Sequence, residues 1–402
     1  MRVTPPVTIT DAKLTSSSAA EPHAPAAYNA GTTYALGAIV SVAADFAIYE
    51  SLAGSNTGNT PASSPLWWRA IGPTETAYNP ATTYALGDTV YSAAAHRCYE
   101  SLAAGNLGNP LPVLPETETT KWIDVGPTNR WAMFDLSRNT QTVAASPLTV
   151  VVAPGQRINT VGLTGLSGNQ AVISATSVAG GGTVYPLPFD AAKTYAKNEC
   201  VTVGLATCYQ SLANNNVGHA PPDATWWAVV SGYVFDLNTR VVNDGYDYAF
   251  EPFSTRASEV VFDLPSFSDI VVTIVLSATS GNVKIGSMAL GTFIYLGQVE
   301  YHAKSDGLNF STITRDLYGT ATLVPRRTLP KTNQTLVLPS YRVNKAMAAR
   351  TLLNALPALW TGLDDATSDW FEMLVILGVY KKFEIDLTQL ARAIIDLELE
   401  EI

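Results

Sequence analysis

Charged side chains are scarce in this chain. Lysine, arginine, aspartate and glutamate make up 14% of its 402 residues, whereas an average soluble protein has about a quarter. The formal net charge of −10 argues against a nucleic-acid partner, because phosphate backbones are bound by basic patches. Hydrophobic residues reach 47%, which is ample for the two to four domains that the length suggests.

Cysteine is also rare. Three cysteines are too few for a disulfide framework. Cys200 and Cys208 are predicted to face each other across a hairpin centred near Gly204. Two interpretations stay open for this pair, a cross-strand disulfide and two reduced residues in a small core, and the second is favoured.

Signatures of catalysis are missing. The sequence has no P-loop, no Gly-x-Gly-x-x-Gly, no His-Glu-x-x-His and no Gly-x-Ser-x-Gly. Its four histidines are scattered without metal-ligand spacing. Asp244-Gly245-Tyr246-Asp247 lacks the spacing of a calcium loop and is predicted to be a turn. Asp364-Asp365 is predicted to lie in a loop, and no carboxylate pair stands out as a glycosidase site. We therefore expect no enzyme activity, no cofactor and no metal.

Long apolar segments are absent as well. No run of eighteen apolar residues occurs, so nothing is expected to span a membrane. Residues 1–6 lead into the chain without the apolar core of a signal peptide, so no secretion signal is expected.

What the chain does contain is a repeated motif. The ten residues from Tyr28 return almost unchanged from Tyr78, and a looser copy follows near Tyr195. Such self-similarity sets the domain organisation before any fold is considered. The shared segments are Tyr49–Ala53, Tyr99–Ala103 and Tyr209–Ala213, then Asn56–Asn59, Asn106–Asn109 and Asn216–Gly218, then Trp68, Trp122 and Trp227.

Each copy is predicted to be a small three-stranded unit. Valines alternate with small residues in the first strand, the second strand ends at a tyrosine, and an Asn/Gly/Pro loop leads to a short Trp-bearing strand. A unit of about 45 residues is near the lower limit for an independent core. The large aromatic side chains must therefore supply much of its buried surface.

This order of residues resembles carbohydrate-binding module family 5/12, the type-3 chitin-binding module. The resemblance covers about 45 to 50 residues three times over, and it implies a small β fold that binds polysaccharide. The family usually carries an exposed aromatic pair just after the second strand, which stacks on sugar. Ser51-Leu52-Ala53 and its two counterparts, residues 101–103 and 211–213, hold that place here. The sequence therefore supports the fold more strongly than sugar binding.

Candidate sugar-binding residues are the aromatic side chains next to the repeated tryptophans. Trp68, Trp122 and Trp227 recur in every copy and are predicted to be core, and strand alternation then places Trp67 and Trp226 on the opposite face. The predicted carbohydrate-binding residues are Trp67, Trp226, Tyr28 and Tyr34. Repeat 2 has Lys121 at this position. Packing of an exposed tryptophan on a neighbouring subunit is an equally weighted alternative.

The remainder of the chain is predicted to be mainly β. Many short strands with glycine turns favour a β-sandwich, and a helix from a Ser340 cap to Pro357 favours a C-terminal α+β module. The predicted domains are an N-terminal arm (1–26), repeat 1 (27–75), repeat 2 (76–128), a jelly-roll-like sandwich (129–188 and 231–304), repeat 3 inserted in it (189–230) and the C-terminal module (305–402). The arm is expected either to carry a short strand at residues 7–10 or to be disordered.

The jelly-roll-like sandwich and the C-terminal module resemble modules of tailed-phage tail-tip proteins. We therefore expect a non-enzymatic virion component of the tail tip or baseplate, assembled in the host cytoplasm, whose repeats contact host surface polysaccharide. Its expected partners are other tail proteins and further copies of itself. A secreted chitin- or polysaccharide-binding protein, and a purely structural tail protein whose repeats bind no sugar, are the alternatives.

Overall fold

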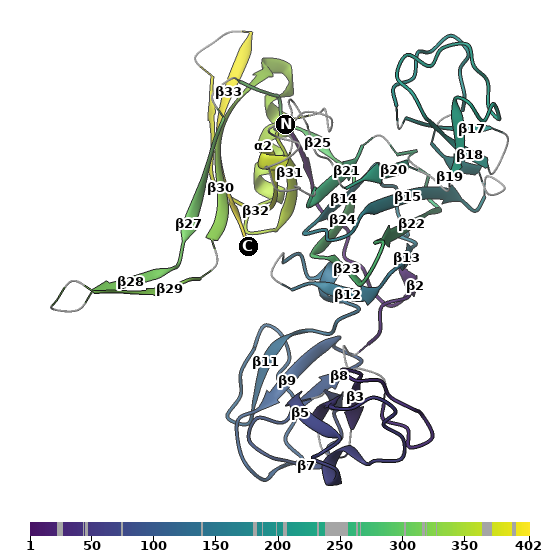
Figure 1. Cartoon of the computed structure of the whole chain (residues 1–402). Coiled ribbons are helices and arrows are strands. Elements are labelled where there is room, and N and C mark those ends of the chain that lie inside the picture. Colours follow the sequence, from purple (N-terminus) through teal and green to yellow (C-terminus); the bar gives the residue numbers. More distant parts are fainter. Residues whose placement is uncertain are drawn as a thin grey trace. The chain divides into compact units, whose positions relative to one another are not determined.

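The structure is a computed structural model, and it confirms the mainly β, multidomain class (Figure 1). Strands make up many small separate sheets, and the described residues contain a single α-helix, α2 (Val343–Leu352). No described helix has the length and apolar character needed to cross a membrane. The structure describes residues 1–21, 27–42, 44, 47–73, 75–137, 140–179, 183–186, 188–197, 199–203, 207–230, 233–237, 256–262, 264–265, 267–300, 303–315, 318, 320–326, 328–363, 372–387 and 391–402.

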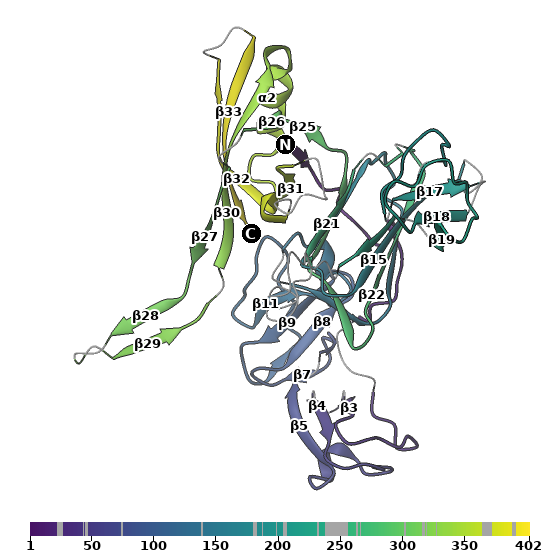
Figure 2. The ribbon, with the colours of Figure 1, turned by 45° about the horizontal axis from the view of Figure 1, so that its top comes forward.

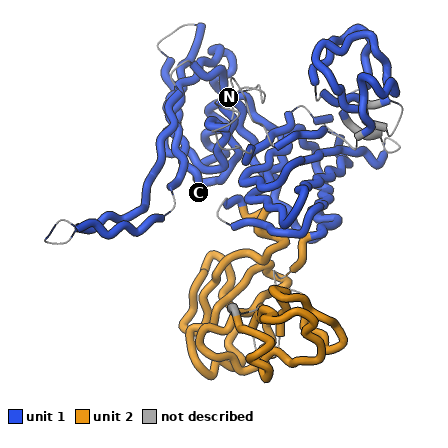
Figure 3. Tube along the Cα trace, in the orientation of Figure 1, with its two compact units in different colours: residues 1–18, 136–402 blue, residues 19–135 orange. Residues whose placement is uncertain are grey.

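The described residues form two compact units (Figure 3). Residues 19–135 contain repeats 1 and 2, and residues 1–18 together with 136–402 contain everything else. The acidic pair 364–365, the turn 244–247 and the hairpin centre at Gly204 lie outside the described residues.

Each repeat is a three-stranded antiparallel sheet, in which the second strand lies between the first and the third. In repeat 2 a short parallel strand, β6 (Thr76–Ala77), is added beside β8. The strands are β3 (Ile39–Val42), β4 (Ala47–Ser51) and β5 (Trp68–Pro73) in repeat 1, β8 (Thr89–Ser92), β9 (Arg97–Ser101) and β11 (Trp122–Pro127) in repeat 2, and β17 (Cys200–Val203), β18 (Thr207–Ser211) and β19 (Trp227–Val230) in repeat 3.

The prediction that Cys200 and Cys208 face each other is wrong. In the hairpin of repeat 3, Cys200 lies opposite Gln210, and Cys208 lies opposite Thr202. Val203 pairs with Thr207, so the centre of the hairpin is one residue later than expected and the two cysteines are offset by two positions. Both carry free thiols.

Repeat 3 lies between two strands that pair with the same neighbour. The strands β16 (Thr183–Tyr185) and β20 (Tyr233–Asp236) both pair with β15 (Gln170–Ser177). The chain thus leaves the large sheet before repeat 3 and returns to the same strand after it.

Two of the sheets in the region assigned to the sandwich differ in burial. In the six-stranded sheet, β15 and β22 (Ile270–Ser277) alternate buried and half-buried residues, as strands with one covered face do. In the three-stranded sheet, β14 (Thr160–Thr164) is buried at every position. Its second face is covered by the C-terminal module, where Leu359 approaches Gly162 so closely that any Cβ there would clash.

The C-terminal module is an eight-stranded sheet with α2 packed on it. Its long strands are β30 (Thr328–Pro339), β32 (Val375–Asp386) and β33 (Arg392–Glu401), and β31 (Ala358–Thr361) pairs with β32. Ala346, Ala349 and Leu353 of the predicted stripe lie in its core. The predicted Ser340 cap is wrong, because residues 340–342 form a 3-10 turn and Arg342 occupies the N-cap of α2.

Residues 1–21, the described part of the predicted arm, contain two strands that pair within larger sheets. The strand β1 (Arg2–Thr4) lies between β31 and β25 (Ile294–Tyr295) in the C-terminal sheet, and β2 (Leu14–Ser17) is an edge of the six-stranded sheet. Residues 7–10 form no strand. The two strands depend on partners far away in the chain, so local sequence carries little sign of them.

A long hairpin extends from the C-terminal sheet (Figure 2). The strand β27 (Lys304–Asn309) pairs with the first half of β30, and β28 (Thr312–Arg315) pairs with β29 (Ala321–Val324) beyond it. Every residue of β28 and β29 is exposed. No other strand pairs with this distal ribbon among the described residues.

Candidate functional site

Three aromatic rings form the core of every repeat. In repeat 1, Tyr28 stacks on Tyr34 at 5.8 Å between ring centres, and both present an edge or face to Trp68, at 5.8 and 5.2 Å. The matching trios repeat these distances to within a few tenths of an ångström. They are Tyr78, Tyr84 and Trp122 in repeat 2, and Phe189, Tyr195 and Trp227 in repeat 3.

A hydrogen-bond frame surrounds each trio. The amide nitrogen of Asn56 donates to the hydroxyl of Ser51 at 3.0 Å and to the carbonyl of Trp67 at 3.2 Å, while Ser51 donates to the carbonyl of Ala53. These asparagines and serines are fully buried, so their polar atoms need such partners. The same bonds join Asn106 to Ser101 and Lys121, and Asn216 to Ser211 and Trp226.

The buried tryptophan is fixed by its indole nitrogen. Trp68 donates to the carbonyl of Asn59 at 2.8 Å, Trp122 to that of Asn109 at 3.0 Å, and Trp227 to that of His219 at 2.7 Å. The preceding glycine of this loop has φ of +74°, +70° and +75° in the three copies. This left-handed conformation explains why glycine recurs there.

Trp67 and Trp226 are half-buried, whereas their neighbours Trp68 and Trp227 are each 3% exposed. Strand alternation did not apply as predicted, because β5 begins at Trp68 and Trp67 lies in the turn before it. Trp226 also packs against the core of its repeat, and His219 stacks on one of its faces at 3.9 Å and 8° between planes. A ligand could therefore stack only on the other face.

Tyr28 and Tyr34 lie in the aromatic core of repeat 1. Both rings pack on Trp68, and the hydroxyl of Tyr34 donates to the carbonyl of Asn29 and accepts from its backbone nitrogen. Tyr28 and Tyr34 are themselves half-buried, whereas Tyr84 and Tyr195, the counterparts of Tyr34, are each 2% exposed. The structure thus places the two predicted tyrosines with the buried tryptophan, where they stabilise the repeat.

Exposed leucines follow the second strand in repeats 1 and 3. Leu52 and Leu212 are 40% and 43% exposed, and the backbone nitrogen of each donates to the carbonyl of Trp67 or Trp226, at 2.8 and 2.9 Å. Repeats 1 and 3 therefore each have an exposed leucine hydrogen-bonded through its backbone to a half-exposed tryptophan. In repeat 2 the corresponding residues are the half-buried Leu102 and Lys121.

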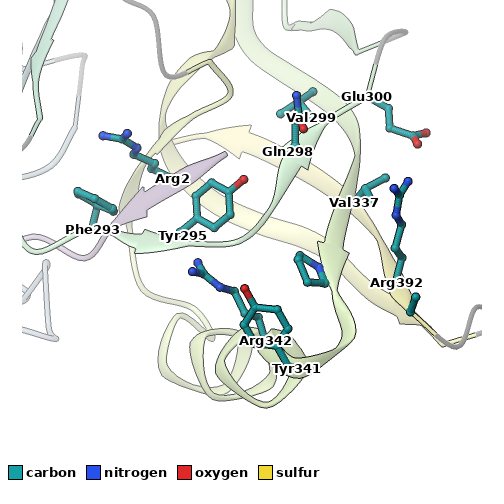
Figure 4. Close-up of a pocket in the computed structure, with 12 residues that line it drawn as sticks. Arg2, Phe293, Tyr295, Gln298, Val299, Glu300, Val337, Tyr341, Arg342 and Arg392 are labelled. Carbon is teal, nitrogen blue, oxygen red and sulfur yellow. The ribbon is translucent and has the colours of Figure 1, made fainter.

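A hollow that the sequence did not predict lies in the C-terminal module (Figure 4). It has a volume of about 1090 Å³, and its lining includes Arg2, Arg342, Arg392, Tyr295 and Tyr341. The guanidinium group of Arg342 lies 5.4 Å from the ring centre of Tyr295, a cation–π distance. Glu300 lines the same hollow, so three arginines and one carboxylate surround it. The net positive charge of the hollow suits an anionic ligand. Its residues come from distant segments, so no local motif announces it.

Cysteine thiols of the repeats have raised pKa values. Burial, reinforced by the nearby Glu75, raises the pKa of the Cys98 thiol to about 12, and burial raises that of Cys200 to about 11. These thiols are therefore protonated at neutral pH and are poor nucleophiles. Among the described residues, no group of three or more histidines, cysteines or carboxylates could hold a metal ion.

Comparison with known proteins adds no neighbour to this geometry. The chain matches no protein-family model, no curated protein and no solved structure.

Proposed function

We propose that this protein is a non-enzymatic structural component of a tailed-phage virion, at the tail tip or baseplate, whose repeats contact host surface glycan. The repetition of one module supports this proposal. All three copies arrange three aromatic rings and a hydrogen-bond frame in the same way. The residue just before the buried tryptophan varies, and is Trp67, Lys121 or Trp226. A conserved core with a variable outer position is what a family of binding modules requires.

The single observation that carries the glycan contact is the half-exposed tryptophan of repeats 1 and 3. Trp67 and Trp226 each lie beside an exposed leucine, and an indole face is the surface on which a sugar ring stacks. One stacked ring contributes on the order of 1 kcal/mol, or about fivefold in affinity. Adhesion would then depend on several modules acting together.

A specific observation also favours a second candidate, a structural tail protein whose repeats bind no sugar. Leu52 and Leu212 stand where the family's aromatic pair would be, and His219 covers one face of Trp226. Repeats of this kind would act as spacers or contact neighbouring tail proteins.

Retention of the full-length protein on chitin beads, and on polysaccharide from a candidate host, separates the two candidates. Replacing both tryptophans, Trp67→Ala with Trp226→Ala, should lower retention about tenfold or more. Lys121→Trp should raise it by adding an aromatic face to repeat 2, and Lys121→Ala is the neutral control. Equal retention of all four proteins, with unchanged melting temperatures, would support the spacer.

The virion assignment has its own test. A labelled antibody against the purified protein should decorate one end of the tail in negative-stain images of phage particles. Particles without label, from a preparation in which a known tail protein is labelled, would refute it.

A further inference from the structure

The long hairpin is an unusual element for a protein with this composition. We call residues 304–331 the basic hairpin. It contains five basic and two acidic side chains, a formal charge of +3, so the rest of the chain carries −13. The hairpin thus has the charge opposite to that of the protein that bears it.

The distal part of the hairpin has an apolar face. Ile313 and Leu323 lie directly opposite each other in the ladder between β28 and β29, so their side chains share one face. They are 63% and 66% exposed. Arg315, two residues after Ile313, lies on the same face and has no carboxylate partner among the described residues.

A ribbon of this kind needs a partner. A two-stranded hairpin without a covering layer is marginally stable in water, and exposed apolar pairs on an unpaired ribbon favour association. The described part of unit 1 provides no covering strand or helix for β28 and β29.

Repeat 2 carries a surface with the complementary character. Residues 110–118, which we call the acidic loop, lengthen the segment before Trp122 and have no counterpart of this composition in repeat 1. Val113 and Leu114 are 78% and 56% exposed. Glu116 and Glu118 follow them and are exposed as well. The loop therefore offers an exposed apolar pair beside carboxylates. The hairpin offers an exposed apolar pair beside Arg315, so the two surfaces are complementary in both apolar character and charge.

We propose that the basic hairpin of one copy docks on the acidic loop of a second copy. Ile313 and Leu323 pack on Val113 and Leu114, and Arg315 pairs with Glu116. The contact is head to tail, because the two surfaces differ, so it builds a ring if the rotation closes. It does not depend on glycan binding by the repeats.

Sedimentation velocity of the full-length protein over a range of concentrations tests this contact. The wild type should associate with increasing concentration, and 0.5 M NaCl should weaken the association, since salt screens exposed charge pairs. Arg315→Glu should weaken the association at least tenfold. Thr314→Glu changes the charge by −1 one residue away, on the opposite face of the ribbon, and its matched partner is Arg315→Gln, which also changes the charge by −1. Arg315→Gln should weaken the association more than Thr314→Glu does.

Charge exchange identifies the receiving surface. Glu116→Arg alone should weaken association as Arg315→Glu does, and the two changes together should restore it. Failure of the double variant to recover would overturn the assignment to the acidic loop. A wild type that stays monomeric at every concentration would overturn the contact itself.

A shortened hairpin guards against indirect effects. Replacing residues 310–327 by Asn-Gly joins the paired Asn309 and Thr328 by a two-residue turn. The change removes no buried side chain among those described, so the rest of the protein should keep its circular dichroism and melting temperature. This variant should be monomeric. Association equal to that of the wild type would contradict the proposal.

Discussion

Repeats 1 and 2 hold their buried tryptophans in the same way, yet they differ in the residue just before it. The carbonyl of Trp67 and that of Lys121 accept the same two hydrogen bonds, from an asparagine side chain and from the nitrogen of Leu52 or Leu102. The backbone of this position is therefore structural, and its side chain is open to change. The positions that recur in both repeats stabilise the module, whereas the position that varies has its side chain on the outside.

The largest expected effect tests the building residues. Trp122 is fully buried, so Trp122→Ala should destabilise repeat 2 by roughly 3–5 kcal/mol, the cost of a large truncation in a core. The neighbouring change Lys121→Ala should stay within about 0.5 kcal/mol. Hydrogen exchange of the repeat 2 amides in the full-length protein measures both. Equal effects of the two changes would remove the distinction between inner and outer positions.

An intermediate effect is expected in the hydrogen-bond frame. Asn106→Ala removes the donor to the buried Ser101 hydroxyl and one of the two donors to the Lys121 carbonyl, which keeps its bond from the backbone nitrogen of Leu102. The change should cost about 1–3 kcal/mol. Thr120→Ala, at an exposed position in the same repeat, is the control, and thermal unfolding of both variants compares them. If Asn106→Ala lowers stability no more than Thr120→Ala does, water must satisfy the groups that Asn106 binds.

The smallest expected effect separates two equivalent tyrosines. The hydroxyl of Tyr78 donates to the carbonyl of Asn109 at 2.7 Å, whereas that of Tyr28 is buried without a hydrogen-bond partner among the described residues. Tyr78→Phe should therefore cost about 1 kcal/mol, and Tyr28→Phe should be neutral or stabilising. Repeat 3 already has Phe189 at this position. Amide exchange within each repeat measures the difference, and a larger loss for Tyr28→Phe would contradict it.

The sequence predicted those parts of the fold that depend on neighbouring residues. Self-similarity located the three repeats and the buried tryptophans, because each trio and frame lies within about 45 residues. The helix predicted between Ser340 and Pro357 contains α2, which ends earlier, at Leu352. The partner of Cys200 was predicted wrongly, because the centre of the hairpin lies one residue later than expected. Strand register depends on turn geometry, which the sequence did not define here.

The candidate site was predicted less well than the core. Two of its four residues, Tyr28 and Tyr34, are half-buried and pack on Trp68, because a ring next to a buried tryptophan is as readily a core residue as a ligand contact. Trp67 and Trp226 are half-buried, since a turn precedes the strand and interrupts alternation. The hollow lined by Arg2, Arg342 and Arg392 could not be predicted from the sequence, because its residues come from distant segments of the chain.

The place of β1 has a consequence for the order of synthesis. Its backbone pairs with β31, and the carbonyl of Arg2 accepts a hydrogen bond from Thr361, which lies 359 residues later. A ribosome that adds about 5–20 residues per second needs on the order of tens of seconds to cover that distance. The repeats have local contacts and can fold as they emerge. Val3 of β1 has no pairing partner until β25 and β31 have been synthesised. Strand β1 therefore leaves the ribosome long before the strands that cover it, and this part of the sheet can be completed only after β31 has been made.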